Sequence, residues 1–351
     1  MYIREELTLN TEKTFKNKFS RIIKMNKNKT IILILMLALS GNLLFAQVPE
    51  LQGSGTEDDP YRIYTVDDIA IVGEFTDSAP LWSLGKYFRV ENDIDDGNHS
   101  FYEAVPTLMG LEHSFKGYFD GQNYKIKLGA NIKYPKSCFG LFQKISDGAK
   151  ISNVIVYGIG GTMVLLDIHN NYVFSGIARE VYDATIENCI NMVNVFSNST
   201  TFYHYLIIGG IAGIVYGPNA QIKNCINMHN IDFTLPDHSL PVTNDMACVG
   251  GIIGAINPIG NNYVLNCSNN GNITEYFSSI YVGAIGGIIG GSTTPNAGIH
   301  SNTIEDCINY GVLTGYNVGG ITGSMVGQLQ NCVNVGVIID EKTGTSGGIT
   351  P

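Results

Sequence analysis

The sequence is poor in basic residues and in tryptophan. Its 351 residues include 21 Lys and Arg against 31 Asp and Glu, and a single Trp. Arg179 and Lys223 are the only basic residues between positions 151 and 340. A surface with so little positive charge repels nucleic acid, anionic lipid and polyuronate chains. The composition therefore excludes a nucleic-acid partner and argues against a polysaccharide lyase that acts on uronates.

Long apolar runs are also missing, except for one near the N-terminus. A basic cluster at residues 24–29 precedes an apolar run at 30–45, and Leu44-Phe45-Ala46 offers a small residue for cleavage before Gln47. This pattern predicts a secretory signal peptide at 1–46, with Met25 as an alternative start. The run is shorter than the ~20 residues of a membrane span, although an uncleaved anchor is the alternative. We expect a secreted or cell-surface protein without a transmembrane span after cleavage.

Cleavage would make the acidic balance stronger. The first 46 residues hold 8 of the Lys and Arg and 3 of the Asp and Glu, which leaves 13 basic and 28 acidic residues and a net charge of −15. About 300 residues remain, enough for one elongated domain.

Clusters that would indicate catalysis or metal binding are scarce. The seven histidines are scattered, without the close pairs typical of zinc sites. Residues 91–97 resemble a calcium loop, but the Gly comes one place late and the twelfth position has no Glu, so a plain acidic turn is the favoured interpretation. Glu187 and Glu305 should lie three coils apart, too far for a glycosidase pair, and Lys223 is expected to form a surface ion pair with Glu187. We therefore predict no catalytic residues, no metal and no cofactor.

What the chain does contain is a repeat. Each copy begins with a GGIxG-like motif and continues to Asn/Asp-Cys-x-Asn, ending on Ile, Val or Leu. The copies place cysteine at 189, 225, 267, 307 and 332, at steps of 36, 42, 40 and 25 residues. A fixed pattern at this period is typical of a solenoid, in which each repeat is one structural unit.

The repeat predicts an all-β, right-handed parallel β-helix. Three short β-runs per copy suggest three strands per coil: one at GGIxG, one ending at the Asn-Cys corner and one ending at the last Ile or Leu. The paired glycines would supply backbone conformations that corners need, and Asn188, Asn224, Asn266 and Asn331 tolerate the left-handed region. Ile222, Cys225 and Ile231 are expected to point inward and to stack on their equivalents in neighbouring coils.

Two further columns follow from the repeat. The second Asn of the motif (191, 227, 269, 309, 334) should form a ladder of amide hydrogen bonds from coil to coil. The five column cysteines should have parallel Cβ bonds about 4.8 Å apart, more than a disulfide prefers. We therefore predict buried free thiols, with a disulfide or a metal site as the alternative.

The N-terminal part should cap the solenoid. Residues 47–135 are assigned to a short cap and the first coils, and 136–351 to the repeat β-helix. A strand at 61–64 precedes a short helix capped by Thr65 that runs to Phe75. Residues 86–90 are strand-like, and 115–121 with 124–128 are two strands around an Asp-Gly turn, a pattern typical of a hairpin. The first coil-like unit is expected at 139–156, with Val154 in place of the column cysteine.

These motifs resemble those of the GLUG-motif surface proteins of bacteria. The resemblance rests on Gly53-Ser54-Gly55-Thr56, Asp59-Pro60-Tyr61, Asn92-Asp93-Ile94-Asp95, Phe115 to Gly121 and the GGIxG repeats. It covers nearly all of 53–351, although most copies read Gly-Ile-x-Gly where the family has Gly-Leu-x-Gly. The resemblance implies a right-handed β-helix, an adhesin-like role at a cell surface of the Bacteroidetes type, and no catalytic residues.

Aromatic insertions are the candidate binding sites. Tyr203 and Tyr205 belong to one insertion, and Tyr276 and Tyr281 to another at a matching point of its coil. Insertions at one point of a solenoid emerge on one side, often the binding side, and exposed tyrosines stack on sugars or anchor proteins. The alternative is that these rings fold back over the core.

The resulting expectation is an exported, non-catalytic adhesion or binding protein whose partner is a host or bacterial glycan or protein. The alternatives are a carbohydrate-active enzyme, either a polysaccharide lyase or a glycoside hydrolase, and a structural stalk for a missing C-terminal module. The sequence ends at Gly347-Gly348-Ile349-Thr350-Pro351, one strand into a further coil. From this we expect a truncated C-terminus and end-to-end self-association through an uncapped last coil.

Overall fold

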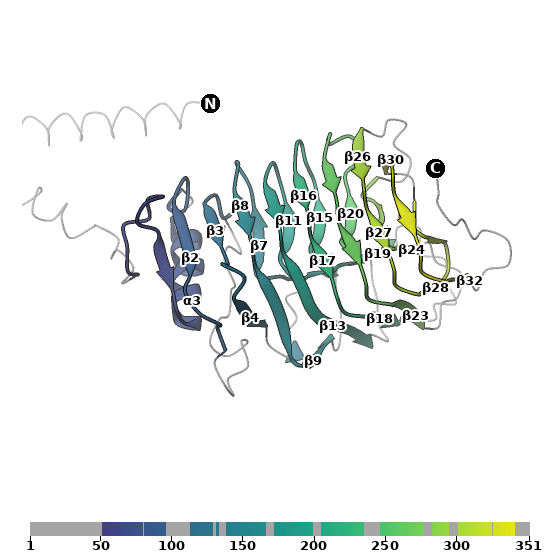
Figure 1. The fold of residues 1–351 in the computed structure, drawn as a ribbon, viewed down its shortest axis with the longest axis horizontal. Helices are drawn as coiled ribbons and strands as arrows, with labels where there is room; N and C mark the ends of the chain where they lie inside the picture. Colours follow the sequence, from purple (N-terminus) through teal and green to yellow (C-terminus); the bar gives the residue numbers. More distant parts are fainter. Residues whose placement is uncertain are drawn as a thin grey trace, which may run out of the picture. The chain divides into compact units, whose positions relative to one another are not determined.

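The computed structural model describes residues 51–79, 81–95, 113–128, 131–132, 138–165, 172–198, 205–234, 246–276, 283–294, 301–324 and 326–340. In this part, short strands stack into four sheets, and every pairing between named strands is parallel (Figure 1). The chain is an all-β, right-handed parallel β-helix, as its repeat predicts. The expected signal peptide lies outside the described residues.

One coil shows the path of the chain. The strand β14 (Tyr205–Gly209) in sheet D leads to β15 (Ala212–Val215) in sheet C and β16 (Gln221–Lys223) in sheet A. The chain then enters sheet B through β17 (Ile226–Asn227) and β18 (Ile231–Thr234) before it returns to sheet D. A coil therefore contains five short strands, and the prediction of three was wrong.

Sheet A has nine strands: β1 (Tyr61–Ile63), β2 (Tyr87–Val90), β3 (Tyr118–Asp120), β8 (Lys150–Ser152), β12 (Thr185–Glu187), β16, β21 (Tyr263–Leu265), β26 (Asn302–Glu305) and β30 (Gly327–Gln330). Sheet D has six: β6 (Cys138–Phe139), β10 (Tyr172–Ser175), β14, β19 (Met246–Gly250), β24 (Gly283–Gly286) and β29 (Val318–Gly319). Sheet C has five: β7 (Phe142–Ile145), β11 (Ala178–Val181), β15, β20 (Ile253–Ile256) and β25 (Ile289–Ser292).

Sheet B has twelve strands: β4 (Lys125–Leu128), β5 (Asn131–Ile132), β9 (Ile155–Leu165), β13 (Ile190–Asn198), β17, β18, β22 (Ser268–Asn269), β23 (Ile273–Tyr276), β27 (Ile308–Asn309), β28 (Leu313–Gly315), β31 (Val333–Asn334) and β32 (Ile338–Asp340). The core lies inside the coils. Ile222, Cys225 and Ile231 are buried there, and Ile222 pairs in register with Ile186 and Val264, as predicted.

A helix lies at the N-terminal end of the stack (Figure 1), and an aromatic cluster packs beside it. The helix α3 (Val66–Ser78) begins at Thr65, whose side chain accepts a hydrogen bond from the Asp68 amide in a capping box. Beside it, Trp82 stacks on Tyr61 at 5.8 Å and packs against Phe88 at 5.5 Å. The predicted cap helix is confirmed, and it extends three residues beyond Phe75.

The GGIxG motif spans a corner between two strands and does not lie within one strand. In the third copy, Gly250 ends β19 and Ile253 begins β20, so Gly251 and Ile252 form the turn between sheets D and C. Neither glycine has a φ in the left-handed region, contrary to the expected role of the pair. The constraint is space: a Cβ on Gly250 would lie 2.0 Å from the Ile253 carbonyl oxygen.

The other glycines of this motif have equally close neighbours. A Cβ on Gly251 would lie 2.3 Å from both the Gly287 carbonyl oxygen and Cγ of Asn269. A Cβ on Gly254 would lie 2.5 Å from Cγ2 of Ile207, because sheets D and C pack closely against each other. Three separate close contacts therefore require glycine at these positions of the motif. A glycine-rich sequence alone does not show whether the motif forms a corner or a strand.

The predicted amide ladder is confirmed inside sheet B. Nδ2 of Asn191, Asn227 and Asn269 each donates to Oδ1 of the next Asn at 2.8 Å, and Asn309 continues to Asn334 at 2.7 Å. At the preceding corner, Asn188, Asn224, Asn266 and Asn331 have φ between 50° and 55°, which confirms their predicted left-handed conformation. Both columns depend on exact stacking of equivalent residues.

The column cysteines are free thiols, as predicted, and Cys332 is less buried than the other four. Their Sγ atoms donate to backbone carbonyls, for example from Cys225 to Lys223 at 3.2 Å. Cys248 is also free and buried, in a second apolar cluster with Ile207 and Ile214. Burial raises the pKa of the Cys248 thiol to about 12 and that of Cys225 well above the ordinary value.

We expect the buried thiols at 189, 225, 248, 267 and 307 to react with a thiol reagent at pH 8 only after unfolding. Burial shields all five thiols from the reagent, and the raised pKa of Cys225, Cys248, Cys267 and Cys307 keeps their reactive thiolate form rare in the folded protein. Counting modified cysteines by mass spectrometry, with and without denaturant, measures this. Rapid labelling of Cys225 or Cys267 in the native protein, or a disulfide between column cysteines, would contradict it.

Two expectations for the first coils need correction. The strands β3 and β4 do not form a hairpin: β3 pairs with β2 and β8 in sheet A, whereas β4 pairs with β9 in sheet B. The turn between them, with Gln122 and Asn123 at positive φ, is a coil corner. Parallel stacking also starts before the expected first unit at 139–156, because β1 already pairs with β2. Residues 341–351 lie outside the described part, so end-to-end association stays a prediction.

Candidate functional site

The insertions between sheets B and D occur at the same corner of successive coils. Residues 166–171, 199–204, 235–245 and 277–282 each connect a strand of sheet B to the next strand of sheet D. This confirms that the two tyrosine insertions occur at matching points. Tyr203 and Tyr281 lie outside the described residues. The backbone of Tyr205 begins β14, and Tyr276 ends β23 with 43 % of its surface exposed. Their role in binding stays a prediction.

Sheet A presents a second candidate surface. The strands β3, β8, β12, β16 and β21 each place one buried residue between two that point outward, because side chains alternate along a strand. The register aligns the outward residues into two columns across the sheet. The first column runs Tyr87, Tyr118, Lys150, Thr185, Gln221, Tyr263, Thr303 and Gln328, and the second Arg89, Asp120, Ser152, Glu187, Lys223, Leu265, Glu305 and Gln330.

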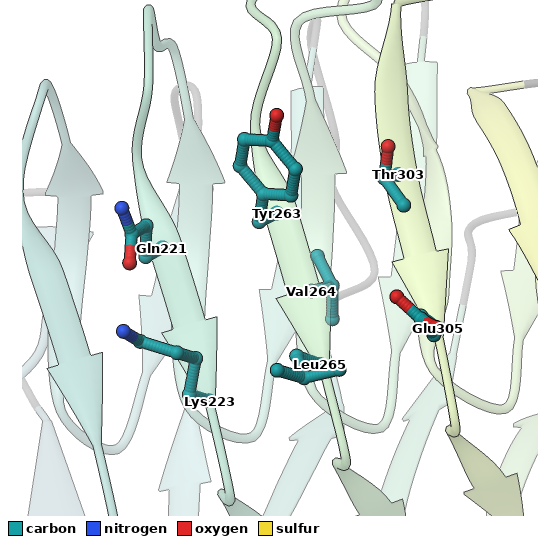
Figure 2. A pocket seen from close by; sticks show the side chains of 7 residues that line it. All are labelled: Gln221, Lys223, Tyr263, Val264, Leu265, Thr303 and Glu305. Atoms are coloured by element: carbon teal, nitrogen blue, oxygen red, sulfur yellow. The ribbon is translucent and has the colours of Figure 1, made fainter.

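A hollow of about 270 Å³ lies on this face over β16, β21 and β26. Figure 2 shows the Tyr263 ring turned broadly toward the viewer, with Leu265 below it on the same strand. The Glu305 carboxylate turns toward β21, whereas Lys223 extends away from Tyr263. Tyr263 is 49 % exposed, and Gln221 and Thr303 on the flanking strands complete the lining. We call this the Tyr263 hollow.

A larger hollow of about 450 Å³ lies on the same sheet over β2, β3 and β8. Its lining includes Tyr87, Arg89, Tyr118, Asp120 and Lys150, with Glu57 at its edge. The rings of Tyr87 and Tyr118 stack at 4.5 Å with an interplanar angle of 22°. Partial burial and the Glu57 carboxylate raise the pKa of the Tyr87 phenol above its ordinary value. We call this the Tyr118 hollow.

The charges on this face largely compensate one another. Nζ of Lys150 lies 2.7 Å from Oε1 of Glu187, and Nη2 of Arg89 lies 2.7 Å from Oε1 of Glu91. The expected ion pair between Lys223 and Glu187 is therefore wrong, since Glu187 contacts the lysine of the preceding coil. The sequence does not show which lysine pairs with Glu187, because Lys150 and Lys223 both belong to strands adjacent to that of Glu187.

Two outward carboxylates of the second column, those of Glu187 and Glu305, are widely spaced. Glu187 and Glu305 lie in register with Lys223 and Leu265 between them, which separates them by three strand spacings, about 14 Å. Glycosidases place their two carboxyl groups roughly 5 to 9.5 Å apart. These two residues therefore cannot act on one glycosidic bond.

The described ranges contain neither a group of metal ligands nor a helix that could cross a membrane. There, no three His, Cys, Asp or Glu side chains are grouped closely enough to hold a metal ion. At 91–95, Asp93 instead accepts from the Lys125 amide at 2.8 Å, and Asp95 pairs with Lys127. Over the same ranges, no helix has both the length and the apolar character needed to cross a membrane.

Sequence reasoning did not identify Tyr87, Tyr118 or Tyr263 as candidate binding residues. They belong to strands, and they occupy positions where other coils carry Lys, Thr or Gln. The available signal was an outward tyrosine next to a buried apolar residue in a short strand, which is common in β-proteins. Their common column becomes evident only from the register of sheet A.

Comparisons with known proteins support the fold. No protein-family model matches the chain, and no curated protein sequence matches it. Its structure is similar to the crystal structure of a protein from Bacteroides ovatus that carries the provisional name immunoglobulin A1 protease. The TM-score is 0.52 at 20 % sequence identity, over 85 % of this chain and 84 % of the other. At this identity the similarity concerns the fold alone.

Proposed function

We propose that the chain is an exported, non-catalytic binding protein of the bacterial cell surface, with a glycan or a protein on a host or bacterial surface as its partner. The observation that supports this most directly is the repeated insertion at the corner between sheets B and D. The strands that flank these segments stack in register, so each segment leaves and re-enters the stack at the same corner, and solenoid proteins often bind partners at such repeated insertions.

We also propose kinship with the GLUG-motif surface proteins. The repeated GGIxG corners support this, because three of their glycines are each required by a close contact. The fold of the Bacteroides ovatus protein is compatible with such kinship. The provisional protease name belongs to that protein, and we propose no proteolytic step for this chain.

The main competing function is a carbohydrate-active enzyme on the same scaffold. The wide separation of Glu187 and Glu305 supports the non-catalytic alternative. A reducing-sugar release assay on the purified mature protein, run beside a cell-attachment assay, distinguishes the two. Sugar release would favour the enzyme, attachment without release the binding protein, and neither activity the structural stalk.

We expect the simultaneous replacement of Tyr203, Tyr205, Tyr276 and Tyr281 by alanine to reduce attachment to cells at least about ten-fold, since exposed aromatic anchors contribute ~2 kcal/mol or more at interfaces. The melting temperature should stay nearly unchanged. Flow cytometry of cells incubated with labelled protein measures attachment. As a control, Tyr64→Ala with Tyr310→Ala removes two exposed tyrosines outside those insertions. Unchanged attachment of the fourfold variant, or its unfolding, would show that these rings do not form the binding surface.

A further inference from the structure

The two hollows of sheet A belong to one continuous surface. In the first column, Tyr118, Lys150, Thr185, Gln221 and Tyr263 follow one another on adjacent strands in register. Tyr118 and Tyr263 are therefore separated by four strand spacings, about 19 Å. Where the chain passes from sheet A to sheet B, the connection is short: only Asn224 and Cys225 lie between β16 and β17. No inserted loop therefore emerges at this edge of β16.

The neutral polar side chains in and between the two hollows suit hydroxyl-rich ligands. Thr185 and Gln221 of the first column and Ser152 of the second present hydroxyl and amide groups, which both donate and accept hydrogen bonds. At either end stands an exposed aromatic ring, with Tyr118 37 % and Tyr263 49 % exposed. Aromatic faces provide apolar platforms with a polar tip. This combination of rings and neutral polar groups is typical of carbohydrate recognition.

The charge of the face indicates which carbohydrates it can accept. Its cations, Arg89 and Lys150, contact the carboxylates of Glu91 and Glu187. Lys223 extends from the same column that carries Glu187 and Glu305. A uronate or sulfated chain would meet these carboxylates without an excess of positive charge to attract it. An uncharged glycan chain is not repelled by these carboxylates.

We propose that sheet A binds a neutral, linear glycan that lies across the strands, parallel to the stacking axis, and spans from the Tyr118 hollow to the Tyr263 hollow. This deepens the proposed function and rests on it, since it names the ligand class of one binding surface. A protein ligand is the competing occupant, but the face lacks the apolar centre that protein interfaces usually bury.

The length of the ligand provides the test. Neutral oligosaccharides of two to eight units from a glycan array, with polygalacturonate as the acidic comparison, are titrated by calorimetry against the mature protein. Affinity should rise with length until both hollows are occupied. Tyr118→Ala or Tyr263→Ala should each weaken the long ligands about ten-fold, the effect of one lost stacking contact of ~1.4 kcal/mol. Tyr310→Ala, which removes an exposed ring beyond sheet A, should have no effect.

Two controls separate recognition from folding and from the proposed function. Tyr118→Phe keeps the stack on Tyr87 and should retain binding, whereas a loss of binding caused by unfolding would appear in the circular-dichroism spectrum. Preference for polygalacturonate, no binding of any neutral glycan, or insensitivity of long ligands to both alanine variants would overturn the inference. If cell attachment persists in those cases, the proposed function stands and only its glycan assignment fails.

Discussion

Gly251→Ala is expected to lower the free energy of unfolding by about 3 kcal/mol or more, the upper end of the usual cost of overpacking. The new Cβ would lie 2.3 Å from the Gly287 carbonyl oxygen and from Cγ of Asn269. The oxygen belongs to the corner of the next coil, and the Asn side chain belongs to the amide ladder, so neither can move without disturbing its neighbours. Urea unfolding followed by circular dichroism measures the loss.

The matched control is Gly148→Asn. Gly148 has a φ of 79° and nothing within 4 Å of the position of a Cβ, and Asn accepts the left-handed region better than most residues. We expect it to change the free energy of unfolding by less than about 1 kcal/mol. Equal stability of Gly251→Ala and wild type would show that the corner is not close-packed.

Asn269→Leu should be comparably destabilising for a different reason. The substitution nearly preserves volume but removes the bonds from Nδ2 to Oδ1 of Asn309 and to the Gly271 carbonyl, and the acceptor for Asn227, all at 2.8 Å. Nδ2 of Asn227 keeps its bond to the His229 carbonyl, so two acceptors, Oδ1 of Asn309 and the Gly271 carbonyl oxygen, lose their donor. At about 1 to 3 kcal/mol for each buried polar group left without this partner, we expect a total loss of about 2 to 6 kcal/mol.

The neighbouring residue supplies the control for this prediction. Asn270 is exposed, and its backbone amide bond to the Asn227 carbonyl would survive Asn270→Ala. The free energy of unfolding of that variant should differ from that of the wild type by about 0.5 kcal/mol or less.

The single tryptophan, Trp82, lies in the N-terminal cap, so its fluorescence reports unfolding of the cap, whereas circular dichroism reports unfolding of the strands. Equal stability of the Asn269→Leu and Asn270→Ala variants would contradict the ladder's role.

The repeat allowed the fold and its interior to be predicted in some detail. Identical residues at equivalent positions must stack in a solenoid, so the buried thiols and the Asn191 to Asn334 ladder follow from the sequence pattern alone. The helix after Thr65 also follows from local chemistry, because a capping box involves residues three apart. These features depend on the period of the chain or on near neighbours in sequence.

Other features depend on which strands become neighbours in space. One strand was expected at the GGIxG motif, whereas the motif spans the corner between sheets D and C, where close contacts leave no room for a Cβ on its glycines. Whether Glu187 contacts Lys150 or Lys223 is decided by side-chain geometry between adjacent strands. Tyr118 and Tyr263 occupy one column although the residues between them in that column differ in type, so no repeat signals their alignment.

The sequence by itself determined the β-helix and its stacked core, because those arise from periodicity. Only the tertiary structure decided the outer face of sheet A, because its surface is assembled by register from residues that share no motif.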